Sequence, residues 1–273
     1  MNSQKQLIGA IHFSPMPGYP GYPGFDIALG NALYDLKAFE TGGMDMIIIE
    51  NNYDIPHKEK ILADAFNEMV SLGKRIRENT DIPIGVSVLW NDYENALKIA
   101  KEINGSFIRV PVFVDRVKTS YGIMEPKAEE VVRFRSALEA QDIKIYADIH
   151  VKHSEILSKY TIQESAQLAI DRGADALIVT GKWTGDSPDL DDLVKVREVV
   201  GDFPIICGSG VDIKNIKELL TIADGAIIST SLKENTDIQH ERNIKPYEVR
   251  ISLNKVMELV KQVRTSSIGG PHF

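Results

Sequence analysis

Short apolar runs alternate along the chain with longer segments in which apolar residues recur every three or four positions. The short runs are rich in Ile and Val, and they are Leu7–His12, Met46–Glu50, Ile84–Leu89, Phe107–Val110, Lys144–Ile149, Ala176–Val179, Pro204–Cys207 and Gly225–Ser229. Runs of this length that are apolar on both faces are typical of strands buried in a parallel sheet. We therefore predict eight parallel strands.

The segments between these runs have apolar residues at helical spacing. Helices are predicted over Ile27–Thr41, Lys58–Asn79, Glu94–Glu102, Ala128–Gln141, Thr161–Arg172, Asp189–Val200, Asp212–Leu220 and from Pro246 to about Arg264. Thr161 with Glu164 has the sequence of a capping box, and Pro246 suits a first helical turn. Each predicted strand is thus followed by a predicted helix.

Eight strand–helix units in this order predict an α/β fold, the (β/α)8 TIM barrel. A doubly wound open sheet is the rival fold, but it often has G-x-G-x-x-G after its first strand, and here HFSPMPG follows. No linker or shift in composition divides the chain, so we expect residues 1–273 to form a single domain. The last residues, about 265–273, contain Gly-Gly-Pro and are expected to form a mobile tail.

The segment GYPGYPG at residues 18–24 allows two interpretations. One is a stiff loop of Pro-Gly turns. The other is a lid that brings Tyr19 and Tyr22 near a substrate.

Composition narrows the class of protein. The chain is 43% hydrophobic and 26% charged, with a formal net charge of −8. It can therefore bury a large core, and it lacks the excess of Lys and Arg that a general nucleic-acid binder needs. Cys207 is the single cysteine, which favours a cytoplasmic protein without disulfides. No stretch approaches the ~20 apolar residues of a membrane span, so we expect no direct membrane insertion. A homo-oligomer is compatible with a barrel.

In a (β/α)8 barrel the active site lies at the carboxyl ends of the strands, so the predicted fold selects candidate residues. The ionisable candidates for catalysis are His12, Glu50, Arg109, Asp148 and Lys152. The polar candidates for substrate binding are Asn51, Asn91, Asp92, His153 and Thr184. A carboxylate beside a lysine and a histidine can act as an acid–base set when the side chains converge.

Two of these candidates have alternative interpretations. Arg109 either pairs with Glu50 or Asp148 inside the barrel or binds an anionic substrate. Lys152 is also a conceivable Schiff-base lysine, but it lies beyond the strand end, where a solvated loop is the simpler expectation.

The ends of the last strands are rich in glycine and small hydroxyl residues. The candidates for phosphate binding are Gly181, Gly208, Ser209, Gly210, Ser229, Thr230 and Ser231. Backbone N–H groups in such turns can face an anion, and barrels often bind phosphate after the seventh and eighth strands. A tight strand–helix turn that needs glycine explains the same residues without a ligand.

A divalent metal is a further option at this rim. His12, Glu50 and Asp148, with His150 or His153, have the residue types that suit zinc or manganese. No compact spacing such as H-E-x-x-H supports such a site, so no metal ligand is assigned. No other cofactor is predicted.

The strand-end motifs together resemble the BtpA family. They are HFSPMPG (12–18), EN (50–51), GVSVLWND (85–92), IRV (108–110), ADIHVKHS (147–154), VTGKWTGDSP (179–188), GSGV (208–211) and ADGAIISTSLK (223–233). The family is named for a cyanobacterial protein involved in stabilising photosystem I, and it is similar to the ribulose-phosphate-binding barrels. The chain departs from the family pattern at Asn52-Tyr53-Asp54, at Trp90 and at Pro111. The resemblance implies the barrel and a phosphorylated ligand, but it implies no particular reaction.

The leading hypothesis is an enzyme that acts on a small phosphorylated sugar or related metabolite. Its reaction would be an isomerisation, an epimerisation or an aldolase- or lyase-type cleavage with acid–base chemistry next to a carbonyl. The alternative is a non-catalytic assembly or stabilising factor that uses the barrel as a scaffold. It would act through outer helices or through the long loops Pro111–Glu125 and Leu232–Lys245.

Overall fold

The computed structural model describes residues 4–181, 186–234 and 246–266. Eight parallel strands form a closed barrel: β1 (Gln6–His12), β2 (Met46–Glu50), β3 (Ile84–Ser87), β4 (Phe107–Val110), β7 (Lys144–Ile149), β9 (Ala176–Val179), β10 (Ile205–Cys207) and β11 (Gly225–Ile228). Every pair of neighbours in the barrel is parallel, and β11 closes the ring against β1. The predicted (β/α)8 barrel in a single domain is confirmed, with each strand within two residues of its predicted bounds.

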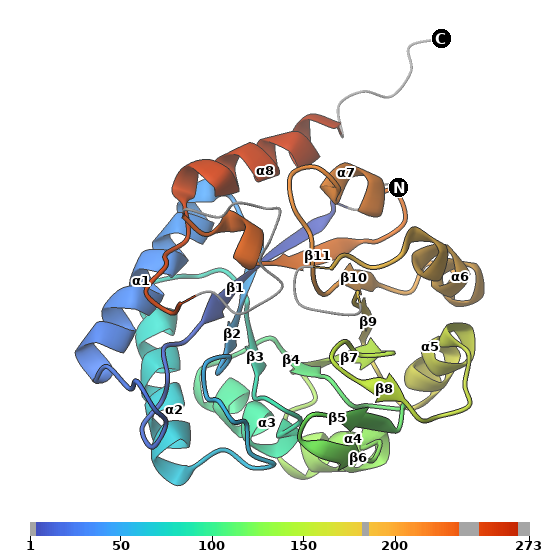
Figure 1. The fold of residues 1–273 in the computed structure, drawn as a ribbon, viewed down its shortest axis with the longest axis horizontal. Coiled ribbons are helices and arrows are strands. Elements are labelled where there is room, and N and C mark those ends of the chain that lie inside the picture. The colour runs from blue at the N-terminus through green and yellow to red at the C-terminus, as the bar shows by residue number, and fades with distance from the viewer. Residues whose placement is uncertain (1–3, 182–185, 235–245, 267–273) are drawn as a thin grey trace.

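The helices surround the strands in an outer ring (Figure 1). They are α1 (Phe25–Gly42), α2 (Ala63–Arg77), α3 (Tyr93–Glu102), α4 (Ala128–Ala137), α5 (Ile162–Asp171), α6 (Leu190–Val200), α7 (Ile216–Leu219) and α8 (Leu253–Ser266). A short 3-10 helix, η1 (Thr230–Leu232), follows β11. The main core lies between the strands and this ring of helices. None of the helices in the described residues has the length and hydrophobicity of a membrane-spanning helix.

The last helix begins later than predicted. Pro246 does not start it, because Ile251 forms an antiparallel bridge with Lys233 and its N–H donates to Asp35 Oδ1 at 2.9 Å. Tyr247 and Glu248 form a turn before this bridge, so α8 begins only at Leu253. Of the predicted mobile tail, residues 267–273 lie outside the described residues, whereas Thr265 and Ser266 end α8.

The inside of the barrel contains a second, smaller core. Successive side chains of a strand point to opposite faces, so alternate residues of each strand point inward. The inward apolar residues are Ile8, Ala10, Ile48, Phe107, Tyr146, Ala176, Ile178, Ile206 and Ile227. The rings of Phe107 and Tyr146 stack with centroids 4.3 Å apart. Gly85 makes room for them, because a Cβ there would lie 2.1 Å from Phe107 Cζ. We call this set the apolar floor.

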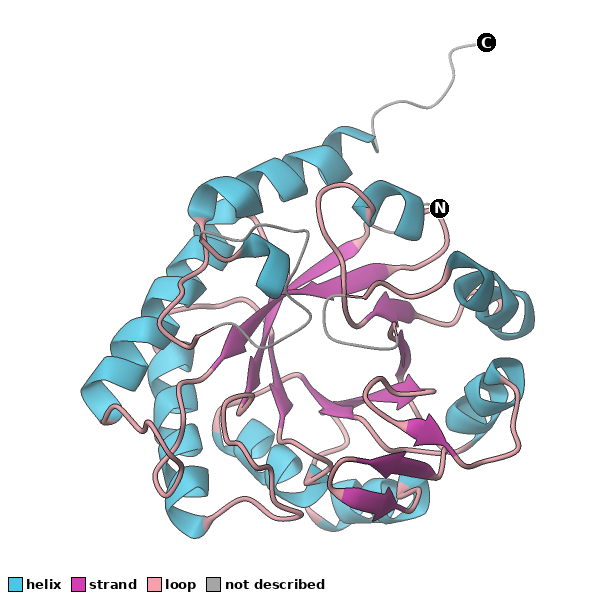
Figure 2. Cartoon of the chain, in the orientation of Figure 1, coloured by secondary structure: helices cyan, strands magenta, loops and turns pink. Residues whose placement is uncertain are grey.

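A three-stranded antiparallel sheet lies beside the carboxyl-terminal end of the barrel and was not predicted (Figure 2). It consists of β5 (Val117–Thr119), β6 (Gly122–Met124) and β8 (Glu155–Ile156), with β5 in the centre. β5 and β6 form a hairpin in the loop after β4, and β8 lies in the loop after β7. The sheet therefore joins two loops that begin on neighbouring barrel strands.

Candidate functional site

A layer of polar side chains lies directly above the apolar floor, at the carboxyl ends of the strands. Because inward residues recur every second position, each strand has one further inward residue at its carboxyl end, two places beyond the last floor residue or, in β3, beyond Gly85. These residues are His12, Glu50, Ser87, Arg109, Asp148, Thr180, Gly208 and Ser229. We call this set the polar layer. It contains four of the five predicted catalytic residues.

Arg109 lies between two buried carboxylates in this layer. Its Nε and Nη2 donate to Asp148 Oδ1 and Oδ2, each at 2.8 Å, and Nη1 lies 3.4 Å from Glu50 Oε1. Glu50 Oε2 in turn lies 3.5 Å from His12 Nε2. Glu50, Arg109 and Asp148 are each less than 10% exposed. Of the two interpretations of Arg109, the structure therefore shows the ion pair, with both carboxylates.

Burial and pairing push the two carboxyl groups in opposite directions. Burial alone would raise the pKa of Glu50, but the bond from His12 and the charge of Arg109 lower it to about 2. At Asp148 burial raises the pKa above its ordinary value, although Arg109 opposes this shift. Burial also lowers the pKa of His12. Carboxyl groups whose pKa values are separated in this way are typical of acid–base sites.

Lys152 lies in the loop after β7, within electrostatic range of the polar layer. Burial, and next the charge of Arg109, lower its pKa to about 8, whereas Glu50 and Asp148 oppose the shift. Its backbone N–H donates to Thr180 Oγ1 at 3.0 Å. The neighbouring His153 has its pKa lowered to about 4 by burial and by the charge of Lys152. The expected exposed loop is thus partly buried at the site.

The predicted substrate-binding residues Asn51, Asn91 and Asp92 are engaged in holding loops. Asn51 Oδ1 accepts the N–H of Leu89 at 2.7 Å, and its Nδ2 donates to Asp54. Asn91 exchanges two hydrogen bonds with the backbone of Val112. Asp92 accepts bonds from Ile61 and caps α3 through Asn95. Thr184 lies outside the described residues.

The predicted phosphate-binding residues form two adjacent turns. The Ser209 hydroxyl accepts the N–H of Gly181 at 3.0 Å and donates to the Asp186 carbonyl at 2.9 Å. The backbone at Asp186 lies against Gly210, where a Cβ would be 2.0 Å from the Asp186 carbonyl carbon. Thr230 and Ser231 begin η1, and the first N–H groups of a helix have no intrahelical acceptor. The structure thus brings these residues together at one side of the rim.

Gly208 has a different surrounding from the other glycines of this set. A Cβ there would lie 2.3 Å from Ile178 Cγ2 and 3.5 Å from Arg109 Nη2. The guanidinium group therefore reaches across the barrel to β10, and the absence of a side chain at Gly208 provides the space.

Several buried polar atoms at this rim have no hydrogen-bond partner. In the described part of the chain such side-chain atoms are His57 Nδ1, Glu68 Oε1, Ser87 Oγ, His150 Nε2 and Ser229 Oγ. All but that of Glu68 lie at the carboxyl ends of barrel strands or in the loops that follow them. Buried polar groups are usually satisfied, so this concentration points to a bound molecule or water.

Five further residues lie at this rim: Ser87, Thr180, Tyr53, His57 and Lys233. The sequence indicated Thr180 as a polar strand end and Lys233 as a source of positive charge, without a role for either, and it gave no indication of the other three. Inward alternation from Gly85 and Ile178 would have found Ser87 and Thr180. Lys233 is 2% exposed, and its Nζ donates to the Tyr53 hydroxyl at 2.9 Å. His57 carries no sequence signal, because it lies in the loop after β2.

The GYPGYPG segment is held to an outer helix at Tyr22. The Tyr22 hydroxyl donates to Glu68 on α2 at 2.6 Å. Tyr19 is 7% exposed, and its carbonyl accepts the N–H of Tyr22 in a turn. The arrangement favours the stiff loop over a lid with Tyr22 near a substrate.

Within the residues that the structure describes, no group of three His, Cys, Asp or Glu side chains is arranged to hold a metal ion. His12 and Glu50 are neighbours, but Asp148 is bound by Arg109 on both oxygens. The metal option therefore gains no support from these side chains.

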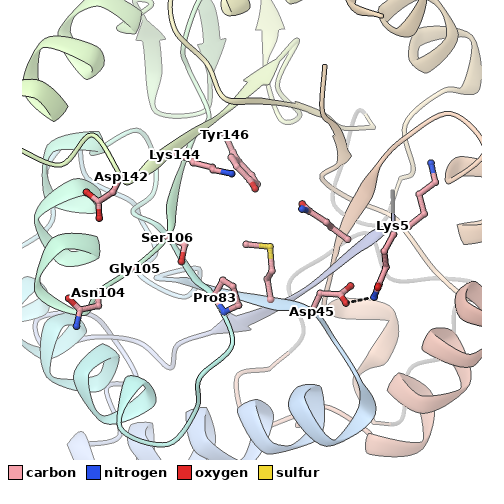
Figure 3. Close-up of a pocket in the computed structure, with 12 residues that line it drawn as sticks. Lys5, Asp45, Pro83, Asn104, Gly105, Ser106, Asp142, Lys144 and Tyr146 are labelled. Carbon is pink, nitrogen blue, oxygen red and sulfur yellow. Dashed lines mark hydrogen bonds between the residues drawn. The ribbon is translucent and has the colours of Figure 1, made fainter. Parts of the chain in front are cut away.

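A hollow of about 660 Å³ lies at the opposite end of the barrel (Figure 3). Lys5, Asp45, Lys144 and Tyr146 are among the residues that line it, and it begins beneath the apolar floor. Asp45 is bound there by Leu7, Gln4 and Arg264. This end holds none of the predicted site residues.

Comparison with known proteins agrees with this arrangement. The BtpA family model matches residues 3–258. The chain belongs to the BtpA family. An uncharacterised family member from Thermococcus kodakarensis is 36% identical over 97% of this chain and 98% of its own length. The photosystem I biogenesis protein BtpA of Synechocystis is 32% identical over 96% of this chain and 91% of its own.

Solved structures similar to this BtpA-family chain are TIM barrels. Their sequence identity to the chain is low, so the similarity shows a common fold and nothing about activity. Phosphoribosyl anthranilate isomerase from Thermus thermophilus has a TM-score of 0.58 at 14% identity, covering 96% of this chain and 99% of its own. Geranylgeranylglyceryl phosphate synthase from Thermoplasma acidophilum, solved with sn-glycerol-1-phosphate, has a TM-score of 0.58 at 15% identity, covering 96% and 94%.

Proposed function

We propose that this BtpA-family barrel is an enzyme that acts on a small phosphorylated sugar or related metabolite. The observation that supports it best is the polar layer, in which paired ionisable groups lie beside hydroxyl groups that have no partner. Nothing in the folded chain alone requires such unsatisfied groups, whereas a ligand with several hydroxyl groups would bond them. The phosphorylated ligands of the structural neighbours support the same class of substrate.

In this proposal the phosphate lies at the turns after β10 and β11. The backbone N–H groups of Ser209 and Gly210, and those at the start of η1, would face it. Lys233 and Lys152 add positive charge near the rim, although the chain as a whole carries −8. An anionic ligand is therefore favoured at a site in an acidic protein.

The proposed reaction is an isomerisation, an epimerisation or a carbon–carbon cleavage next to a carbonyl. Glu50 is ionised at neutral pH and can accept a proton, and His12 or Lys152 can stabilise negative charge on an enediolate oxygen. Asp148 either takes part in proton transfer when substrate displaces Arg109 or holds Arg109 in place. We expect the protein to work in the cytoplasm, as its single cysteine suggests.

Two measurements test the proposal. Phosphorylated aldoses and ketoses are incubated with the protein and followed by NMR, and Glu50→Gln and Asp148→Asn should each lower turnover by at least ~100-fold. Asp142→Asn, an exposed acid at the opposite end, is the control and should keep full turnover. Full turnover in both rim variants would show that the assigned roles are wrong.

Phosphate binding is tested separately. Inorganic phosphate should raise the melting temperature, and Thr230→Asp should abolish that shift by placing a negative charge in the turn. Ser71→Asp, on the exposed face of α2, should respond like the wild type. An unchanged response in Thr230→Asp would exclude phosphate from this turn.

The name of the Synechocystis relative supports a second candidate, an assembly or stabilising factor. The hairpin of β5 and β6 exposes 40% of Tyr121 and 55% of Ile123, which suits contact with a protein. Residues 235–245 of the other long loop lie outside the described residues. Under this function, Tyr121→Ser with Ile123→Ser would impair the cellular role, whereas Glu50→Gln would leave it intact.

A further inference from the structure

We propose that Lys152 is a nucleophile that forms an imine with the carbonyl carbon of the substrate. This inference rests on the proposed function, and it narrows the substrate to a phosphorylated aldehyde or ketone or a related carbonyl compound. It also assigns Lys152 a different role: the residue forms a covalent bond to the reacting carbon instead of stabilising negative charge on an oxygen.

The loop after β7 holds Lys152 at the site. His150 and His153 have φ angles of 47° and 59°, so the chain turns sharply on both sides of Lys152. Asp115 fixes this turn, because its carboxylate accepts the N–H of His150 and the hydroxyls of Ser158 and Ser165. The bond from Lys152 N–H to Thr180 Oγ1 ties the same loop to the polar layer.

The amine of Lys152 lies close to the layer's charged groups. Its charge lowers the pKa values of His12, Glu50 and Asp148, so it acts on three side chains that come from three different strands. The backbone bond from Lys152 to Thr180 places the residue at the same carboxyl ends of the strands.

The neighbouring carboxylates are already engaged by other partners. Arg109 binds both oxygens of Asp148, and Glu50 lies between Arg109 and His12. Within the described residues, the amine of Lys152 makes no ion pair or hydrogen bond with any of them. Partial burial and a neighbouring guanidinium group both favour the neutral form of a lysine, and no carboxylate here stabilises the charged form. The neutral amine is the nucleophilic form.

The proposed step is balanced without an oxidant or a metal. The nitrogen attacks the carbonyl carbon, a C–N bond forms, and the proton lost by nitrogen passes to the oxygen. The C–O bond then breaks with one proton from solvent, which yields a protonated imine and one water molecule. The positive nitrogen withdraws electrons from the adjacent carbon, where Glu50 can remove a proton.

Reductive trapping tests the imine directly. The purified full chain is incubated separately with dihydroxyacetone phosphate, glyceraldehyde 3-phosphate and pyruvate in the presence of cyanoborohydride, and peptides are analysed by mass spectrometry. With at least one probe, the mass of the peptide that contains Lys152 should increase by the mass of the probe minus one oxygen atom. This peptide should be modified at least ~10-fold faster than the peptide that contains Lys144. Lys152→Arg, which keeps the charge, should lose the adduct, and Lys144→Ala at the opposite end should retain it.

A second measurement needs no substrate. Competitive labelling with acetic anhydride over a pH series should give a midpoint near pH 8 for Lys152. A midpoint of about 10.4, the ordinary value of a lysine in water, would contradict the proposed setting of the amine.

The two proposals fail separately. Absence of an adduct at Lys152 with all three probes, or full turnover in Lys152→Arg once a substrate is known, overturns the imine. The melting-temperature response to inorganic phosphate decides independently whether the phosphate-binding function survives.

Discussion

The two ends of this barrel are both charged, but they differ in what surrounds the charges. At the amino-terminal end, Lys5, Asp45 and Arg264 lie at a surface open to water, with roughly a quarter of each paired side chain exposed. At the carboxyl-terminal end, Glu50, Arg109 and Asp148 are buried and converge from three strands. The hollow at the amino-terminal end is therefore a weaker indication of function than the buried, convergent chemistry at the other end.

The strongest test of this contrast is removal of the central cation at each end. Arg109→Met leaves two buried carboxylates without their partner, so it should lower the free energy of unfolding by about 3–5 kcal/mol. Arg264→Met breaks a partly exposed pair and should cost about 1 kcal/mol or less. Urea denaturation of both variants provides the measurement. Equal losses would mean that the two ends do not differ in the way described.

A smaller effect is expected from filling space beside Arg109. Gly208→Ala places a methyl group against Ile178 and near the guanidinium, which should cost about 1–3 kcal/mol through overpacking. Gly30→Ala is the matched control, because no atom lies within 4 Å of a Cβ there and it is inside helix α1, so it should stabilise by about 0.5–1 kcal/mol. The melting temperature should fall in Gly208→Ala and rise in Gly30→Ala.

The next effect is a dependence on pH at the carboxyl-terminal end. Burial lowers the pKa values of His57 and His153 from 6.5 to about 4, so between these values the unfolded chain binds more protons than the folded one. The stability that these two neutral histidines contribute should therefore be lost as the pH drops from 6.5 to 4. The carboxyl group of Asp54, whose pKa burial raises to about 6, acts in the opposite direction. His57→Gln should make this loss less steep, whereas Gly30→Ala, which changes no titratable group, should leave the pH dependence of stability unchanged. An identical slope in His57→Gln would show that His57 is not buried in its neutral form.

The smallest effect on stability is expected from a substitution in the hollow at the amino-terminal end. Lys144→Ala removes an exposed lysine that lines it, and it should change the free energy of unfolding by less than about 0.5 kcal/mol. It should also leave phosphate binding and any turnover unchanged. A loss of turnover in this variant would reverse the assignment of the two ends.

The barrel could be predicted because its strands are continuous apolar runs and its helices have a clear period. The small sheet could not, because β8 has two residues and β5 and β6 have three each, too few for a pattern. Pro246 was misleading, because the bond from Ile251 to Asp35 outweighs its preference for a first helical turn.

The part of the candidate site that could be predicted is the part that follows from the alternation of inward and outward side chains along the strands. His12, Glu50, Arg109 and Asp148 are inward strand residues, and their convergence follows from barrel closure. The pairing of Arg109 with both carboxylates was one of two open interpretations, since distances across a barrel leave no trace in the sequence. The position of Lys152 depends on the left-handed turns at His150 and His153, residues in which such backbone angles are uncommon and hard to anticipate.

The three-stranded sheet has a consequence for the loop that carries Lys152. Val117 pairs with Ile156, three residues beyond His153, so the exposed hairpin and the loop that carries Lys152 share one set of backbone bonds. Under the proposed function, a substitution at the hairpin tip would therefore be felt at the loop that carries Lys152, although the two lie far apart in the sequence.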